Sequence, residues 1–535
     1  MQSRPTFRQI SLTGARVTRP AWALPAAALA LLAQPLQADT TPEAVWQLIQ
    51  EEAGPVLTAQ ESRRGSDLVL SHPRLALPDG AWLALPNITL RQQSDGAVTL
   101  ELPPNFPVEL QGLTGPDAPE KVTLTITAPD LQAVFRDIDA EDIDVAISAG
   151  SLSAVMEPIT QATGWNGKNT LVAALTLDDL SFAWLSQLPP EPELNAKGAG
   201  ADAHLSLGNL SLDARAVIPS EGVEGQVSLN LSELSLALEA LFPPGGIALM
   251  ESADAPDLQK LPQFLAMLEQ GLRLHLRYQM GPVQLAIDMP ELPEGPFAMD
   301  LSMAGSDAEF SLDRNGLVYD KGAEGTAFSF QGQLTDMPLD NLSLSIAEMR
   351  ETVRLGLPSA GGASDWALLY KFAGIDVSET IWDIFDPARQ LPRDPLSLVL
   401  DLTGTWTPDP RLLSGSPSAH DLPLTALTAQ LNEALVAGAG VSFSGEGALD
   451  FDFTDRSRYI DDLPVPEGAL SFLTKGANAL LDNLVALGAI SPDELTGARF
   501  ALMFAGKALS DDPDVLTTEL EFKDGSIVLN GMKIR

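Results

Sequence analysis

The feature that most constrains this chain is an alternation of apolar and polar side chains with a period of two residues. The segment from Val122 to Thr127 alternates without a fault. Similar alternation occurs at Leu68 to Leu70, Leu83 to Leu90, Val98 to Leu102, Leu205 to Leu212, Val227 to Leu231, Leu234 to Leu238, Leu272 to Leu276, Leu342 to Ile346 and Leu396 to Leu402. Each segment predicts a short β-strand with one apolar and one solvated face.

One-sided strands favour antiparallel sheets over the doubly covered parallel sheets of α/β enzymes. The sequence therefore predicts a mainly β fold, built on a long curved antiparallel sheet that is grooved or sandwich-like. A few peripheral helices and a C-terminal helical hairpin complete this prediction.

The expected helices are few. Thr41 can cap a helix that has Pro42 at its first position. Two more are predicted at Leu258 to Gln270 and at Ser378 to Phe385, with Ser378 as the cap. The C-terminal hairpin is predicted from an apolar helix face, from a stop near Gly488 and from a capping box that begins at Ser491. The residues of that face are Leu473, Ala477, Leu480, Leu481 and Leu484.

The N-terminal segment has the layout of a secretory signal. Four arginines precede the apolar run Ala21 to Ala33, and small residues lead to Ala38, after which an acidic chain begins at Asp39. We expect a signal peptide over residues 1–38, cleaved after Ala38, and a periplasmic location. An uncleaved anchor is the alternative, although the apolar run is shorter than the roughly 20 residues that span a bilayer as a helix.

The remaining chain is longer than a single core usually grows, so two domains or one elongated repetitive structure are expected. A soft boundary near residue 330 divides it into an N-terminal β-rich region, 39–330, and a C-terminal β-rich region with the helical hairpin, 331–535. There is no cysteine, so stability must come from burial and not from disulfides.

The charge of the chain excludes one class of partner. Lys and Arg number 32 against 72 Asp and Glu, which gives a formal net charge of −40. Nucleic acid binds proteins mainly through phosphate contacts with Lys and Arg, so we expect no nucleic-acid partner. Anionic lipid headgroups should also be repelled. A lipid would therefore have to be held by its acyl chains or through a bridging divalent cation.

Motifs for catalysis or for cofactor binding are not found. The four histidines have no zinc-ligand spacing, and no G-x-S-x-G, P-loop or G-x-G-x-x-G pattern occurs. The acidic run from Asp137 to Asp144 has Asp142 where a calcium loop needs Gly and Ser148 where it needs Glu, so we interpret it as solvated charge. His275 is expected to face solvent opposite the leucines of its strand. We predict no enzyme activity, no metal and no cofactor, although a site assembled from distant residues stays an alternative.

Three stretches resemble a known family. They are L-P-N-I-T-L-R-Q-Q-S-D-G-A-V-T-L from Leu85, W-D-I-F-D-P-A-R-Q-L-P-R-D-P-L-S-L from Trp382, and the tail from Leu481 to Arg535. Together they resemble the proteobacterial family called domain of unknown function 2125, which implies a secreted or periplasmic protein without catalytic residues to transfer. The segment Leu427 to Phe453 is similar to the strand pairs of AsmA-like envelope proteins, which implies a long grooved sheet that holds or passes lipids.

The apolar sides of several strands are rich in Leu and Met and poor in Val and Ile. Flexible side chains suit a loosely specified ligand, so we expect an apolar groove that holds phospholipid or another acyl-chain ligand. The candidate groove residues are Leu205, Leu207, Leu229, Leu231, Leu236, Met299, Leu301 and Met303. The alternative is an envelope scaffold that binds another protein and whose apolar faces pack together as a sandwich. Arg393 is expected to stiffen a proline-flanked loop or, alternatively, to grip a carboxylate or phosphate.

The signal-peptide interpretation makes a direct prediction. N-terminal sequencing of the native protein should begin at Asp39, because export removes the basic and apolar segment before it. Recovery of an intact Met1 in the membrane fraction would contradict cleavage and would make the segment an anchor.

Overall fold

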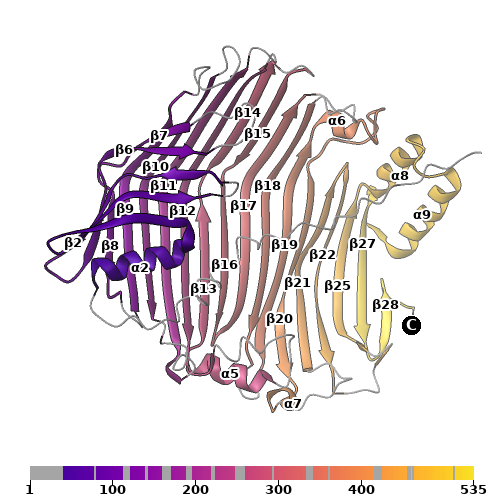
Figure 1. Ribbon diagram of the computed structural model, residues 1–535. Coiled ribbons are helices and arrows are strands. Elements are labelled where there is room, and N and C mark those ends of the chain that lie inside the picture. The colour runs from indigo at the N-terminus through magenta and orange to yellow at the C-terminus, as the bar shows by residue number, and fades with distance from the viewer. Residues whose placement is uncertain are drawn as a thin grey trace, which may run out of the picture.

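The fold is taken from a computed structural model (Figure 1). The structure describes residues 40–77, 80–112, 121–138, 142–158, 170–187, 189, 196–218, 223–246, 260–291, 295–332, 341–358, 362–414, 424–454, 459–460, 463–509 and 512–534. The predicted signal peptide and the centre of the acidic run lie outside the described residues. Within them, 27 strands form one antiparallel sheet, which confirms the mainly β prediction.

The sheet begins with short strands. They are β1 (Leu57–Arg64), β2 (Asp67–Ala76), β3 (Trp82–Ala84), β4 (Ile88–Gln92), β5 (Val98–Glu101), β6 (Asn105–Gln111), β7 (Lys121–Thr127) and β8 (Gln132–Arg136). The long strand β9 (Asp142–Met156) pairs with β8 through its first half and with β7 through its second half. Between β2 and β9 the short strands lie end to end in pairs: β4 with β3, β5 with β6, and β8 with β7, while β1 pairs with the other edge of β2 and β10 with the other edge of β9.

The remaining strands run side by side in nearly chain order across Figure 1. They are β10 (Thr170–Gln187), β11 (Ala199–Ile218), β12 (Val223–Phe242), β13 (Arg273–Met280), β14 (Val283–Glu291), β15 (Phe297–Met303), β16 (Gly305–Asp313), β17 (Gly316–Gln331), β18 (Asn341–Gly356), β19 (Ser364–Val377), β20 (Leu396–Pro408), β21 (Leu424–Gly438), β22 (Val441–Asp452), β25 (Glu467–Lys475), β26 (Lys507–Leu509), β27 (Asp512–Lys523), β28 (Ser526–Leu529) and β29 (Met532–Lys533). A separate pair is formed by β23 (Tyr459–Ile460) and β24 (Leu463–Pro464). The predicted boundary near residue 330 falls between β17 and β18, which are paired neighbours in the sheet.

Helices lie at the margins of the sheet (Figure 1). Helix α2 (Pro42–Ala53), followed by the 3-10 turn η2 (Gly54–Val56), covers the N-terminal strands, and α5 (Leu261–Glu269) meets α7 (Pro410–Leu413) at one edge. Helix α6 (Glu379–Trp382) lies beside β18, and the C-terminal hairpin consists of α8 (Ala477–Ala486) and α9 (Pro492–Ala505). Thr41 accepts a hydrogen bond from the Ala44 N–H at the start of α2, and Ser491 and Glu494 form the predicted capping box of α9.

A crease crosses the long strands at corresponding positions. The ladder between β9 and β10 passes from Asp178↔Ser151 to Leu180↔Ala149, so one residue on each strand is skipped and the register is unchanged. The skipped or strand-breaking residues form a row, which we call the crease: Gly150, Asp179, Gly208, Glu233, Gly281, Ala304, Gly325, Ala347 and Gly374. Four of them have a left-handed backbone, with φ of 53° at Asp179, 56° at Glu233, 58° at Gly325 and 66° at Gly374.

The crease shifts the phase of the apolar pattern. In β12, Val227, Leu229 and Leu231 stand at odd positions, whereas Leu234, Leu236 and Leu238 stand at even positions, with Glu233 between the two sets. In an undistorted strand this shift would place the apolar residues from Leu234 onward on the opposite face of the sheet. A residue that bulges out of the extended conformation re-aims the side chains that follow it. We infer that the crease keeps the apolar side chains of both arms on one face.

Small residues in the crease are explained by close approach between strands. A Cβ on Gly374 would lie 2.8 Å from the Cβ of Ala347, and one on Gly325 would lie 2.9 Å from the Cβ of Ala304. A Cβ on Gly208 would meet the Asp179 side chain at 2.9 Å. Adjacent strands therefore cannot both carry larger side chains at this row.

Three local predictions were wrong. The segments Val227 to Leu231 and Leu234 to Leu238 are not separate short strands but parts of the 20-residue strand β12, because the phase shift at the crease imitates a strand boundary. Leu83 to Leu90 divides between β3 and β4. Leu473 lies in β25 and not in the first helix of the hairpin, which begins at Ala477.

Substitution in the crease should destabilise the sheet. Gly374→Val places a branched side chain on a left-handed backbone, which costs about 1–2 kcal/mol before the contact with Ala347 is added. We expect urea unfolding, followed by circular dichroism, to show a loss of at least about 2 kcal/mol. The control is Gly305→Ala, one residue from the crease, where the nearest atom is a carbonyl oxygen at 3.4 Å and φ is not left-handed. Equal losses in the two variants would contradict a special role for the crease.

Candidate functional site

One face of the sheet carries an apolar row that runs from β5 to β29. Residues that pair directly on antiparallel strands share a face of the sheet. The paired residues in order are Val98, Phe135, Val145, Trp184, Ala203, Leu238, Leu276, Phe310, Tyr319, Val353, Leu368, Leu402, Leu431, Gly447, Leu470, Leu520, Leu529 and Met532. We call this the long apolar row, and the face that carries it the apolar face.

Further apolar rows lie on the other side of the crease. One contains Leu175, Leu212, Leu229, Leu285, Leu301, Phe328, Leu344 and Val377. Another contains Leu152, Leu177, Leu210, Leu231, Val283 and Met303. With the phase shift at the crease, these rows belong to the same apolar face as the long row.

The structure brings the eight candidate groove residues to three strands of this face. Leu205 and Leu207 lie on β11, with Leu205 opposite Leu236 of β12. Leu229 and Leu231 are on the other arm of β12, and Leu301 and Met303 lie two strands away on β15, together with Met299 opposite Ile287. Leu207 is buried, whereas Leu236 and Leu301 are 37% and 36% exposed. The remaining five are half-buried.

Exposure of the apolar face changes along the sheet. Under α2, side chains such as Leu70, Leu90 and Val98 are fully buried against Val45 and Trp46. Beyond β9, large side chains of the same face are partly open, from 36% for Leu344 to 52% for Val436. Interdigitating side chains of two packed sheets would be buried. The apolar face is therefore covered at its N-terminal end and half-open along the rest of the described strands.

The sequence analysis missed much of this face. Tyr370, Leu398, Val436 and Phe443 are 39–52% exposed and lie on strands from which no candidate was chosen. Val436 pairs with both Leu398 and Phe443, and the rings of Phe443 and Phe472 stack with centroids 5.2 Å apart. The same alternation was present in these segments and could have identified them.

The opposite face is polar and is crossed by ion pairs. Arg277 contacts Glu309 at 3.3 Å, and Lys371 contacts Glu348 at 2.6 Å. Asp320 is buried and accepts hydrogen bonds from Arg350, Thr352 and Arg354. His275 lies on this face, opposite the leucines of β13 as expected, but it does not face solvent freely: its side chain is 27% exposed, with Nε2 3.4 Å from Asp313 Oδ2.

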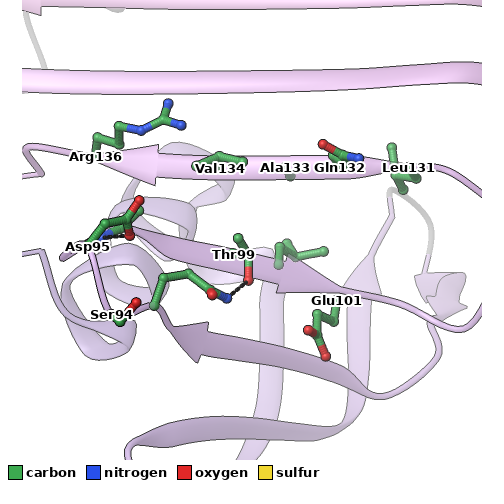
Figure 2. A pocket seen from close by; sticks show the side chains of 12 residues that line it. Ser94, Asp95, Thr99, Glu101, Leu131, Gln132, Ala133, Val134 and Arg136 are labelled. Carbon is green, nitrogen blue, oxygen red and sulfur yellow. Dashed lines mark hydrogen bonds between the residues drawn. The ribbon is translucent and has the colours of Figure 1, made fainter.

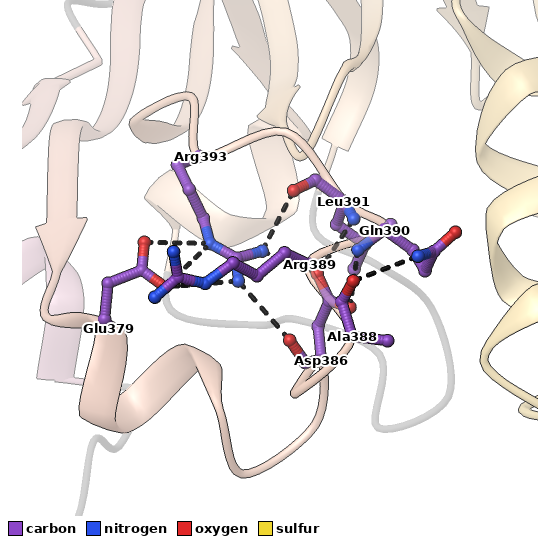
Figure 3. A network of polar contacts seen from close by, with 7 residues as sticks. All are labelled: Glu379, Asp386, Ala388, Arg389, Gln390, Leu391 and Arg393. Atoms are coloured by element: carbon purple, nitrogen blue, oxygen red, sulfur yellow. Dashed lines mark hydrogen bonds and ion pairs between the residues drawn. The ribbon is translucent and has the colours of Figure 1, made fainter.

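The loop between β19 and β20 is held by a buried carboxylate (Figure 3). Asp386 is fully buried and accepts hydrogen bonds from Gln390 N–H and Leu391 N–H, both at 2.8 Å, and from Arg393 at 2.6 Å. The Arg393 guanidinium also contacts Glu379 at 3.2 Å and lies over the Trp382 ring. These contacts favour the structural interpretation of Arg393 over a ligand-binding one. Ser378 precedes α6 as predicted, but its side chain makes no capping hydrogen bond.

Two hollows lie away from the apolar face. One, of about 520 Å³, is lined by Thr99 and Glu101 of β5 and by Gln132 and Arg136 of β8, on the side of these strands that faces away from α2 (Figure 2). The other, of about 950 Å³, is at one end of β16 to β20 beside Arg354 and Asp365. Among the described residues, no histidine lines either hollow. Neither shows a nucleophile held by a base, so neither supports a hydrolytic site.

Among the described residues, no three His, Asp or Glu side chains are grouped so that they could hold a metal ion. Residues 139–141, at the centre of the acidic run, lie outside the described residues. Within the described part of the chain, no helix is long and apolar enough to cross a membrane.

No protein-family model, curated protein or solved structure matches this chain. The resemblances to the domain of unknown function 2125 and to AsmA-like proteins therefore stay predictions.

The buried carboxylate makes the stability of its loop dependent on pH. Burial alone raises the pKa of Asp386. Hydrogen bonds from Arg393 and from the backbone N–H groups of Gln390 and Leu391 lower it by more than burial raises it, so the pKa lies below its usual value. A carboxyl group whose pKa is lowered by folding stabilises the fold at pH values above its unfolded-state pKa of about 3.9. This stabilisation is lost as the pH falls through the folded-state pKa.

We therefore expect Asp386→Asn to lower the melting temperature near neutral pH. The difference from wild type should shrink as pH falls below about 3.9. The matched control is Asp383→Asn, an exposed neighbour in the same loop that should have little effect at any pH. A difference between wild type and Asp386→Asn that persists unchanged in acid would contradict this role for the carboxylate.

Proposed function

We propose that this protein is a non-enzymatic periplasmic envelope protein that holds or transfers lipids by their acyl chains on the apolar face of its sheet. The observation that carries the proposal is the partial exposure of large apolar side chains along the face that carries the long apolar row. An exposed apolar surface larger than a few hundred Å² is rare in monomeric proteins unless a function accounts for it.

The residue types on this face suit a chain-like ligand. Leu, Met, Phe and Tyr supply apolar contacts without a convergent set of polar groups that would fix one orientation. Burial of each methylene of an acyl chain contributes about 0.8 kcal/mol, so a long chain can bind without a specific headgroup site. This agrees with the net charge of −40, which disfavours recognition through anionic headgroups.

The geometry of the sheet supports several chains or one extended path. Adjacent strands are about 4.8 Å apart, and the long apolar row crosses them at a right angle to their direction. An acyl chain lying along the row would contact several strands in turn. Because α2 covers the N-terminal end of the apolar face, exchange would take place along the half-open part or at the C-terminal end.

The alternative is an envelope scaffold that binds another protein. Ile384 and Phe385 favour it, because they are 66% and 54% exposed and lie in the loop that Asp386 holds in place. A rigid exposed apolar pair is typical of a protein-binding anchor. This loop lies at the end of the strands and not on the apolar face, so the two functions are compatible.

The lipid proposal predicts a bound ligand. Mass spectrometry of organic extracts from the purified protein should detect phospholipid or fatty acid at near-stoichiometric amounts. Leu236→Glu places a charge on the half-open part of the apolar face and should reduce the bound lipid severalfold, because burying an unpaired carboxylate against an acyl chain is unfavourable.

The matched control is Asn230→Glu on the same strand, an exposed position on the opposite face, which should keep its lipid. Melting temperatures of both variants should stay close to that of wild type. A lipid-free wild-type protein that also fails to take up a fluorescent fatty acid would exclude the lipid proposal and favour the scaffold.

A further inference from the structure

Two charged residues stand on the apolar face among uncharged neighbours. Lys321 lies two residues after Tyr319 on β17, and these two residues share a face of the strand. Glu351 lies two residues before Val353 on β18 and shares its face in the same way. Tyr319 and Val353 are members of the long apolar row. Lys321 and Glu351 pair directly across the two strands, so the apolar face contains one positive and one negative charge side by side.

The residues next to this pair along the strands face the other way. Asp320, just before Lys321, accepts hydrogen bonds from Arg350 and Thr352 of β18. Arg350 and Thr352 are the two chain neighbours of Glu351. Their contacts with Asp320 lie on the polar face and hold β17 and β18 together beneath the charged pair. Lys321 and Glu351 therefore project from a fixed part of the sheet.

The surroundings of the pair on the apolar face are uncharged. The row that contains it continues to both sides through Phe182, Leu205, Leu236, Tyr278, Ala308, Tyr370, Leu400, Ala434, Gly445 and Phe472. The next row toward the crease consists of Met280, Ser306, Ala323, Met349, Phe372, Leu398, Val436 and Phe443. The long apolar row lies on the other side. Among the described members of these three adjacent rows, Lys321 and Glu351 are the charged residues.

The two charges have no partner within the described part of the chain. Lys321 is exposed and Glu351 is half-buried, and neither makes an ion pair or a side-chain hydrogen bond with another described residue. On the polar face of the neighbouring strands, by contrast, Lys371 contacts Glu348 at 2.6 Å. Water can solvate Lys321 and Glu351 while the apolar face is open. When an acyl chain covers this face, both charges lose water and need partners of opposite sign.

A zwitterionic headgroup supplies both partners. Directly opposed residues of antiparallel strands have Cβ atoms about 4.5–5.5 Å apart. A phosphate diester with a primary ammonium two carbons away can present its phosphate to Lys321 and its ammonium to Glu351. Tyr370 pairs with Glu351 on the next strand and is 40% exposed, so an aromatic ring stands beside the ammonium position. A fatty acid or an anionic phospholipid would leave Glu351 without a partner and would be repelled by it.

We propose that Lys321 and Glu351 bind the zwitterionic headgroup of a phosphatidylethanolamine lipid whose acyl chains lie on the apolar rows beside them. This inference rests on the proposed lipid function and names the substrate class of the same face. Leu236 lies three strands from Lys321, which is about 14 Å at the usual strand spacing. An acyl chain of the bound lipid can therefore reach the position that Leu236→Glu alters.

The test is competition between two lipids with the same acyl chains. The full chain is incubated with vesicles that contain equal amounts of dioleoyl phosphatidylethanolamine and dioleoyl phosphatidylglycerol, separated from the vesicles and extracted for mass spectrometry. The wild type should carry at least about tenfold more phosphatidylethanolamine than phosphatidylglycerol, which is the effect expected from one charge-assisted hydrogen bond.

Variants separate the two charges. Glu351→Gln should bring the bound ratio close to that of the vesicles, because it removes both the partner of the ammonium and the repulsion of phosphatidylglycerol. Lys321→Gln should lower the bound amount of both lipids, since each loses the partner of its phosphate. The matched controls are Glu348→Gln and Lys371→Gln, which make the same charge changes on the polar face of β18 and β19 and should keep the wild-type amount and ratio. Melting temperatures check that each variant is folded.

The outcomes distinguish this site from lipid carriage itself. A wild type that carries the two lipids in the ratio of the vesicles, or a ratio that Glu351→Gln leaves unchanged, would overturn the headgroup site while lipid carriage stands. Equal effects of Glu348→Gln and Glu351→Gln would assign the preference to net charge and would also overturn the site. A wild type that takes up neither lipid nor a fluorescent fatty acid would exclude carriage, and the headgroup site with it.

Discussion

The structure depends on a one-sided sheet whose apolar face must stay in phase over many strands. The long strands from β9 to β19 interrupt their ladders at the crease, and a strand that did so alone would lose its register with both neighbours. The crease solves this because adjacent strands interrupt their ladders at the same row, as between Asp178↔Ser151 and Leu180↔Ala149. The interruption changes which face of the sheet the following odd and even positions occupy, without changing which residues pair. An apolar surface can therefore continue past the crease on one face.

The same constraint accounts for how the two faces and the ends differ. The polar face is crossed by ion pairs and contains the buried Asp320 cluster, which fixes neighbouring strands without a second layer. In the described chain, the core that joins a helix to the sheet through many buried residues lies under α2. The high net negative charge opposes self-association of a protein that leaves large apolar side chains half-open.

Much of this architecture could be predicted from alternation alone. The sequence pattern predicted the antiparallel sheet, its polar face and the helices that begin after Thr41 and Ser491, because these depend on side chains only a few residues apart. It divided β12 at Glu233, since a left-handed residue inside a strand and a turn between strands break the pattern in the same way. The end-to-end short strands between β2 and β9, the row from Val98 to Met532 and the partners of Asp386 depend on contacts between residues distant in the chain, which one sequence does not reveal.

The crease also makes the length of this molecule an adjustable quantity. Both ends of the sheet are specialised, one by α2 and the other by α8 and α9, while the hairpins between them repeat one plan. A hairpin inserted in the middle, with a left-handed residue on one strand and Gly or Ala opposite it, would preserve register and face on both sides. Each added strand would extend the sheet by about 4.8 Å. Proteins built on this plan could therefore differ in the length of the sheet while keeping the same two ends. The number of hairpins would set that length.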